Sequence, residues 1–226
     1  MNWSKKIYPC ITTGPKQSWQ SKIWECDRLN IQEVSVFPTF LKLNERKKLY
    51  AALEKSNIKH IPHVHIRDDF KKWEMDFFFK KYGTRYFNIH EHSFDDLHNY
   101  PEYKKYIYLE YNYNNRIPKM VKVNKIAGLC IDFSHMWAAK NRSAKEFDEI
   151  NKNIKSFKVG CNHLNGYSYR YRRDVHFITD KKQLDYLKDI PNKYFGNVIS
   201  LEMQNSIVEQ LKYKKYIVSI LSKKSN

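Results

Sequence analysis

Short apolar runs rich in β-branched residues recur along the chain, separated by longer segments in which apolar residues follow a helical spacing. The runs predict eight strands, at residues 6–13, 33–39, 60–66, 85–92, 106–112, 126–135, 158–165 and 197–203. Because these runs are almost continuously apolar, they are typical of parallel strands that are covered on both faces.

The intervening segments predict helices, at residues 18–30, 44–57, 68–83, 93–105, 144–156, 180–190 and 206–221. Asn44 is expected to be the N-cap of the second helix, and Gly83 is expected to close the third. Strands that alternate with helices favour one α/β domain over residues 1–226, a closed (β/α)8 TIM barrel. An open doubly wound sheet is the structural alternative.

The charge of the chain narrows the class of partner. Lys and Arg number 41 against 24 Asp and Glu, which leaves a net charge of +17. Such an excess favours a polyanion, either nucleic acid or a phosphorylated substrate. An AT-rich coding sequence, which favours Lys and Asn, is the alternative explanation of the same composition.

The cellular setting is inferred from what the sequence carries. No apolar run approaches the roughly 18 residues that a membrane span needs, and the start MNWSKKIYPC has no hydrophobic signal core. The four cysteines have no CxxC spacing and are expected to be buried thiols in a reducing compartment. We therefore expect an intracellular, monomeric protein that is neither secreted nor in a membrane.

Acids and histidines gather where the predicted strands end, which is where TIM barrels carry their chemistry. They are His63, His65, His90, His92, Glu110, Asp132, His135, His163, Asp174, His176 and Glu202. A carboxylate that follows an apolar strand is costly to bury unless it is paired or bound to a metal. Imidazoles and carboxylates that converge on one opening are suited to Zn²⁺, with Mn²⁺ or Fe²⁺ as alternatives.

The motifs also resemble a known family. The order PH, NxH, LE, CIDxxHxxAA, HLN, DxH and LE is similar to the endonuclease IV family of apurinic/apyrimidinic (AP) endonucleases, most closely at residues 128–139 and 161–176. The resemblance implies a TIM barrel that cleaves duplex DNA on the 5′ side of abasic or damaged nucleotides through metal-bound hydroxide. The chain departs from the family in shorter loops after the first strands and in Gly166, which replaces an acidic residue.

Carried over by position, the resemblance implies up to three Zn²⁺ ions. The implied ligands are His63, His90 and Glu110 for the first ion, Glu110, Asp132, His163 and Glu202 for the second, and His135, Asp174 and His176 for the third. Glu110, Asp132 and Glu202 are the expected catalytic residues. His65 and His92 have no implied role, and the choice of His63 over His65 rests only on the preceding Pro62.

Arginine and tyrosine side chains are the candidates for DNA contacts. They are Arg67, Arg116, Tyr169, Arg170, Arg172 and Arg173. Interleaved Tyr and Arg can stack on bases and pair with phosphates. A solvated loop of drifting composition is the alternative for the segment around Tyr169.

Two other classes of protein remain open. A sugar or sugar-phosphate isomerase or epimerase of the xylose-isomerase-like barrels would use one divalent ion, with Glu110 and Glu202 as an acid/base pair. A non-enzymatic nucleic-acid-binding module on the same barrel is the third class. More than one bound ion per chain would favour the nuclease over the epimerase.

Overall fold

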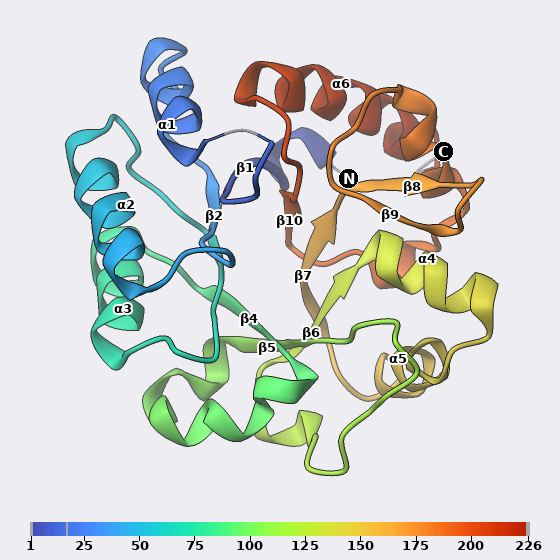
Figure 1. Cartoon of the computed structure of the whole chain (residues 1–226). Helices are drawn as coiled ribbons and strands as arrows, with labels where there is room; N and C mark the ends of the chain where they lie inside the picture. The colour runs from blue at the N-terminus through green and yellow to red at the C-terminus, as the bar shows by residue number, and fades with distance from the viewer. Residues whose placement is uncertain (1, 17, 225–226) are drawn as a thin grey trace.

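Eight parallel strands close into a barrel in the computed structural model, which describes residues 2–16 and 18–224 (Figure 1). The strands are β1 (Ile7–Thr12), β2 (Ser35–Phe37), β3 (His63–His65), β4 (Tyr86–His90), β5 (Ile107–Glu110), β6 (Gly128–Asp132), β7 (Val159–Leu164) and β10 (Val198–Leu201). Each lies within one of the eight predicted segments. Closure comes from β1, which pairs with both β2 and β10, so the TIM-barrel prediction is confirmed and the open sheet is wrong.

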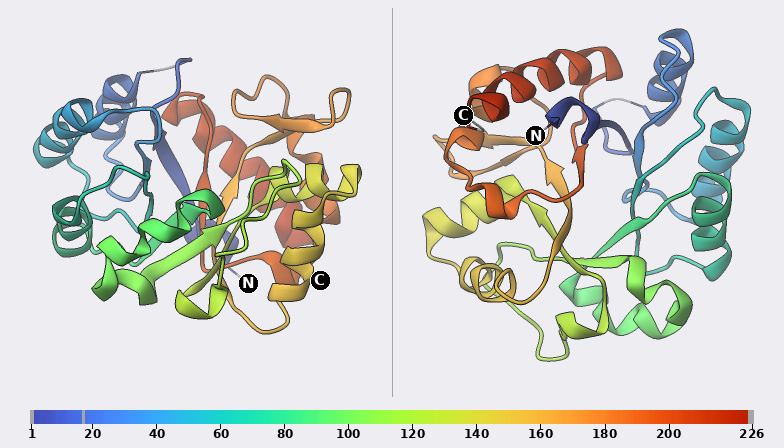
Figure 2. Two further views of the ribbon diagram at one scale, coloured as in Figure 1. Left: turned by 60° about the horizontal axis from the view of Figure 1, so that its bottom comes forward. Right: turned by 180° about the vertical axis from the view of Figure 1, so that it is seen from behind.

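Helices surround the barrel, as the two views of Figure 2 show. The α-helices are α1 (Trp19–Arg28), α2 (Leu43–Lys55), α3 (Lys72–Asp76), α4 (Phe133–Arg142), α5 (Lys145–Asn153) and α6 (Ile207–Lys223). A π-helical turn, η2 (Phe77–Lys81), follows α3. The 3-10 segments are η1 (Trp3–Lys5), η3 (Glu91–Asn99), η4 (Pro101–Tyr106), η5 (Val123–Lys125), η6 (Lys181–Asp189) and η7 (Asn192–Tyr194). No helix in the described part of the chain is long and apolar enough to cross a membrane.

The helices differ from the prediction at several places, since the segments predicted at 93–105 and 180–190 are 3-10 helices and the third helix begins only at Lys72. Two further differences have a local cause. The N-cap of α2 is Lys42 and not Asn44, because the helix already begins at Leu43. The predicted sixth strand ends at Asp132, whose side chain accepts from the backbone N–H of His135 and so begins α4, a helix that the sequence pattern did not indicate. Gly83 follows the third helical segment as expected, and its φ of +68° is the left-handed conformation that favours glycine.

A short antiparallel hairpin projects from the end of β7. It is formed by β8 (Gly166–Ser168) and β9 (Arg173–Val175), which pair with each other and with none of the barrel strands. The apolar pattern does not predict these two strands, because the segment is polar and each strand has only three residues. The hairpin holds residues 169–172 at its tip beside the barrel mouth (Figure 1).

The core lies between the strands and the outer helices. Residues such as Val64 and Ile89 pack there with Leu49 and Leu221 of the helices. The barrel interior is polar, although bulky branched side chains usually fill it. The buried polar side chains within it include Ser35, His63, Asn88 and Ser200, which bond one another there.

Candidate metal centre

Three groups of acids and histidines, with no residue in common, lie at the carboxyl ends of the barrel strands. They are His65, His90 and Glu110; Asp132, His163 and Glu202; and His135, Asp174 and His176. Within each group the possible ligand atoms lie within 4.8 Å of one another. These groups are called the first, second and third triads below. Glu110, Asp132 and His135 also form such a group, which joins the three triads.

The first triad is set by the register of three neighbouring strands. His90 pairs with Glu110 across β4 and β5, and His65 ends β3. The His65 Nε2 atom lies 3.1 Å from His90 Nε2 and 3.3 Å from Glu110 Oε2. His90 Nδ1 lies 3.9 Å from the same Glu110 oxygen. Two imidazoles and one carboxylate are a common ligand set for Zn²⁺ and Fe²⁺.

The structure corrects one member of the expected ligand set, since it places His65 and not His63 in the first triad. The His63 Nδ1 atom is 2.7 Å from Ser200 Oγ and its Nε2 atom is 2.9 Å from Asn88 Oδ1. Both ring nitrogens are therefore already hydrogen-bonded. His63 lies deeper in the barrel, and the clue drawn from Pro62 was misleading because residues 63 and 65 share one face of the strand.

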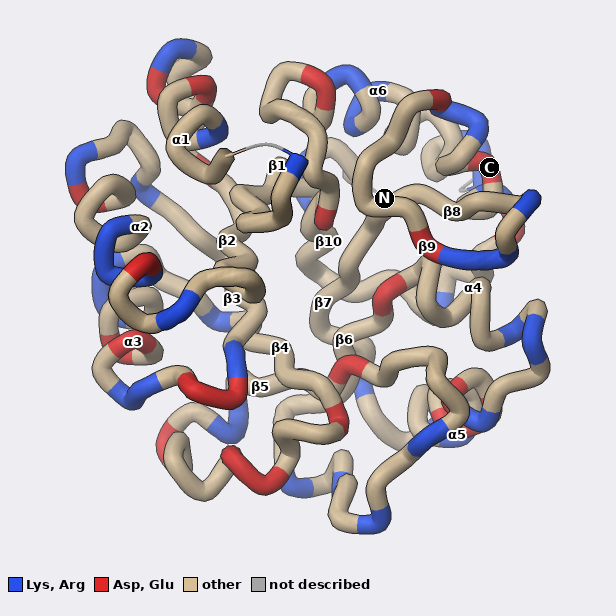
Figure 3. Tube along the Cα trace, in the orientation of Figure 1, with Lys and Arg blue, Asp and Glu red and all other residues tan. Residues whose placement is uncertain are grey.

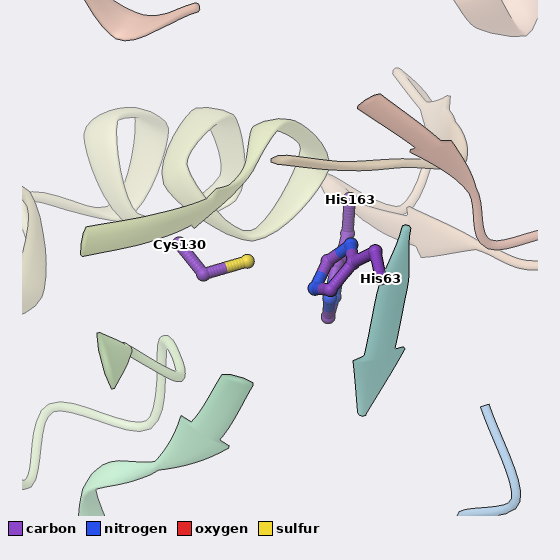
Figure 4. A group of neighbouring side chains, drawn as sticks. All are labelled: His63, Cys130 and His163. Atoms are coloured by element: carbon purple, nitrogen blue, oxygen red, sulfur yellow. The ribbon is translucent and has the colours of Figure 1, made fainter. Parts of the chain in front are cut away.

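His63 forms a separate group with Cys130 and His163, whose possible ligand atoms also lie within 4.8 Å of one another. Figure 4 shows the Cys130 side chain pointing from β6 toward the two rings. The centroids of the His63 and His163 rings are 5.3 Å apart, so the rings pack against each other. Because the nitrogens of His63 are engaged elsewhere, we interpret His63 and Cys130 as the floor beneath the triads, against which His163 of the second triad packs.

The second triad is built on β6, β7 and the residue that follows β10. His163 pairs with Asp132 on one side and with Ser200 on the other, which brings Glu202 close. His163 Nδ1 lies 3.1 Å from Glu110 Oε1 and 3.2 Å from Glu202 Oε2.

Asp132 is held in place by three donors. Its Oδ1 atom accepts from the His135 backbone N–H and from Ser134 Oγ, both at 2.8 Å. Its Oδ2 atom accepts from Asn165 Nδ2 at 3.1 Å. A carboxylate oriented in this way is fixed before any ligand arrives.

The third triad joins α4 to the β8–β9 hairpin. His176 Nε2 lies 3.0 Å from Asp174 Oδ2, and His135 Nε2 lies 4.0 Å from the same oxygen. The other Asp174 oxygen accepts from the Tyr113 hydroxyl. His176 Nδ1 is 3.2 Å from the backbone oxygen of Glu202, which fixes the ring next to the second triad.

The site keeps most of its carboxylates ionised. Burial alone would raise the pKa of Glu110 and Glu202. His163 instead holds the pKa of Glu110 well below its ordinary value and lowers the pKa of Glu202 to about 2. Burial raises the pKa of Asp132, and it lowers that of His90 to about 3. The hydrogen bond to Asp174 outweighs burial at His176 and raises its pKa to about 10. Ionised carboxylates beside a neutral His90 form a set of ligands that attracts a cation.

Unpartnered nitrogens test whether a metal fits this site. The Nδ1 atoms of His90, His135 and His163 are buried and have no hydrogen-bond partner among the described residues. His163 Nδ1 is close to two carboxylates but is aligned with neither for a hydrogen bond. A buried polar atom without a partner is costly, and a bound cation would remove that cost. The chemistry of the donors therefore fits divalent metal ions.

A cavity of about 210 Å³ opens onto the triads. It is lined by Thr12, Gly14, Thr39, Phe40, His65, His90, Glu110, Asn112, His135, His176, Glu202 and Gln204. The lining residues Thr12, Thr39, Asn112 and Gln204 were not among the site residues predicted from the sequence. Their only sequence signal is a polar side chain near a strand end, which many loops share.

Lysine and arginine lie mainly around the outside of the barrel, where acidic stretches also occur, and further acidic stretches lie near β6, β9 and β10 (Figure 3). Among the predicted DNA-binding residues, Tyr169, Arg170, Arg172 and Arg173 are exposed at the β8–β9 hairpin. Arg116 is exposed elsewhere, between β5 and β6. Arg67 differs from these residues, because its guanidinium binds Asp69 at 2.9 Å and the Thr39 carbonyl within the protein.

Comparisons with known proteins add little to this geometry. No family model matches the chain, and no curated protein matches it. A solved structure similar to it is the thiamine phosphate pyrophosphorylase from Pyrococcus furiosus, with a TM-score of 0.48 and 10% sequence identity over 96% of each chain. This likeness concerns the fold.

These findings correct the expected identity. The assignment to the endonuclease IV family is wrong, because no family model and no curated protein of that family matches the chain. The predicted AP endonuclease function, the zinc endodeoxyribonuclease activity and the role in DNA repair are wrong with it, as is the sugar isomerase alternative, for which no family model or curated protein matches either. The physical reason is that acids and histidines at strand ends are what any metal-binding TIM barrel displays, whatever its substrate.

Proposed function

We propose that this chain binds two or three divalent metal ions at the mouth of the barrel and uses them to bind a small anionic substrate. The observation that carries the proposal is the set of three separate triads whose buried Nδ1 atoms, at His90, His135 and His163, lack partners within the described chain. Each triad combines imidazole with carboxylate, as divalent transition-metal sites do.

Glu110 is the residue that would join two of the sites. Its Oε2 atom faces His65 of the first triad, whereas its Oε1 atom faces His163 of the second. A carboxylate with one oxygen toward each site can bridge two ions. This geometry favours a multinuclear centre over a single ion.

We propose Zn²⁺ as the resident ion, with Mn²⁺ or Fe²⁺ as the alternatives that the same ligands accept. The first and third triads each offer two imidazoles and one carboxylate, which suits the borderline-soft Zn²⁺. Mg²⁺ prefers an all-oxygen set and fits these triads poorly. Bound ions would supply Lewis-acid stabilisation of negative charge on oxygen.

The cavity suggests the size and charge of the substrate. Its volume of about 210 Å³ suits a small molecule. Thr39, Asn112 and Gln204 offer hydroxyl and amide groups, and no Lys or Arg lines the described cavity. An anion bound there would therefore take its counter-charge from the metals and its orientation from these side chains.

The experiment is metal analysis of the purified protein after chelation and reconstitution with Zn²⁺, Mn²⁺ or Fe²⁺ in turn. We expect at least two ions per chain, with Zn²⁺ bound most tightly. Inorganic phosphate, titrated by calorimetry, should bind the reconstituted protein and not the chelated one. The Glu110→Gln variant should bind metal far more weakly. Glu45→Gln makes the same chemical change at an exposed position on α2 and is the matched control. Binding of one ion or none would contradict the proposal.

DNA binding is a second proposal, and it is supported by the β8–β9 hairpin alone. Arg170 and Arg173 lie 5.2 and 5.5 Å from the Tyr171 ring, which is 59% exposed. Exposed tyrosine between arginines can stack on bases and contact phosphates. A gel-shift titration with duplex DNA tests it, and unaltered binding after loss of Arg170 and Arg172 would contradict it.

A further inference from the structure

Five buried polar side chains form one continuous row through the barrel interior, which ends at Glu110 of the first triad. They are Ser35 of β2, Ser200 of β10, His63 of β3, Asn88 of β4 and Glu110 of β5. Each is at most 1% exposed. Side chains so deeply buried must satisfy one another, because water does not reach them.

The direction of each hydrogen bond in the row follows from Glu110. A carboxylate that binds a cation is ionised and can only accept, so the Asn88 amide turns its Nδ2 donor toward Glu110 Oε2 at 2.7 Å. The Asn88 Oδ1 atom then faces His63 Nε2 at 2.9 Å and accepts from it. His63 must therefore carry its proton on Nε2.

The other side of His63 is fixed by the same logic. A neutral imidazole with a proton on Nε2 has an acceptor at Nδ1, and Ser200 Oγ lies 2.7 Å from that atom and donates to it. Ser200 in turn lies 2.6 Å from Ser35 Oγ, which leaves Ser35 as the donor. No carboxylate contacts His63 in the described structure, so a charged ring would be uncompensated there.

We propose that His63 is a positioning residue that holds Glu110 in its bridging orientation through Asn88. The inference rests on the proposed metal-binding function, because Glu110 is the ligand that it positions. Asn88 binds Glu110 Oε2, which leaves Oε1 beside His163 Nδ1 at 3.1 Å. Without His63 the Asn88 amide loses the partner that fixes which of its two ends faces the carboxylate. Groups that orient metal ligands in this way typically contribute 10-fold to 100-fold in metal affinity.

The first test reads the proton on His63 directly, in metal-free protein. Two-bond ¹H–¹⁵N correlation spectra of histidine-labelled protein distinguish the two neutral tautomers, and the spectrum of His63→Gln assigns the signal. We expect His63 to be protonated on Nε2 alone. A proton on Nδ1, or on both nitrogens, would overturn the proposal.

The second test compares metal affinities by calorimetry. His63→Phe should weaken Zn²⁺ binding by roughly 10-fold to 100-fold. His63→Gln, which keeps an N–H able to reach Asn88, should retain most of the affinity. His98→Phe, at an exposed position on η3, is the control. Unchanged affinity in His63→Phe would overturn the proposal.

Two further measurements separate the possible failures. If His63→Phe does not fold, Ser200→Ala removes only the donor to Nδ1 and should give a mixture of tautomers, whereas an unchanged single tautomer would overturn the assigned direction. If the unaltered protein binds no metal, the proposed function fails. The tautomer measured in metal-free protein still decides the direction of the row in that case.

Discussion

Replacement of Glu110 by Gln should remove the link between two metal sites without unfolding the barrel. Gln keeps an oxygen that can accept from Asn88 Nδ2, so the buried hydrogen bond of 2.7 Å has a partner in the variant. The negative charge that faces His65 and His163 is lost. We therefore expect a folded protein whose first and second triads bind metal far more weakly.

The size of the effect follows from mass action. At a free ion concentration of 100 times Kd, each occupied site stabilises the folded state by about 2.7 kcal/mol. Two weakened sites together forfeit about 5 kcal/mol. Because 1 kcal/mol shifts Tm by about 2–4 °C in a chain of this size, the metal-induced rise in Tm should shrink by roughly 10–20 °C.

Differential scanning calorimetry of chelated and Zn²⁺-reconstituted protein measures this rise. Glu45→Gln makes the same chemical change on the exposed face of α2 and should leave the rise intact. If Glu110→Gln shows the same metal-induced rise as the unaltered protein, Glu110 is not a shared ligand and the reasoning fails.

Three other predictions follow from individual groups. Burial lowers the pKa of Lys22 from 10.5 to about 8, so between these values the unfolded chain binds more protons than the folded one and stability rises with pH. Relative to Lys22→Met, the unfolding free energy should gain about 1 kcal/mol from pH 7 to 9 in urea titrations, and parallel curves would contradict this. The pKa of His176, raised to about 10, means that metal must displace its proton. Calorimetry should therefore show proton release and tighter binding from pH 6 to 8, and His176→Gln should lessen both; a pH-independent affinity would refute the assignment. Loss of Arg170 and Arg172 should weaken DNA binding and flatten its salt dependence, whereas an unaltered salt slope would argue against the hairpin.

The barrel was predictable because its signal is repeated. Eight separate apolar runs each marked a strand, so an error at one boundary did not disturb the whole. Helix α4 was missed for a local reason, since the run at 126–135 continues apolar past Asp132. The chain changes from strand to helix at that residue because the Asp132 side chain caps the new helix.

At the metal centre, the sequence does not show how deep in the barrel each histidine lies. His63 and His65 are two residues apart on one strand and face the same side, so periodicity treats them alike. Only the barrel shows that His65 reaches the mouth, whereas His63 lies below it between Ser200 and Asn88. Ser200 gave no signal, since a single serine in an apolar run is common.

The role of Arg67 could not be predicted for a different reason. A basic residue after a strand can face a ligand or an acid of the same loop, and the sequence does not distinguish the two. In the structure Asp69 takes the guanidinium at 2.9 Å. The arginines of the β8–β9 hairpin remain candidates because they are exposed.

Anomalous diffraction at the zinc edge, from crystals grown with Zn²⁺, tests the central claim most directly. We predict at least two anomalous peaks at the barrel mouth, one ligated by His65, His90 and Glu110 and the others by the second and third triads. A mouth without peaks, or an ion ligated by His63 in place of His65, would contradict the assigned metal centre.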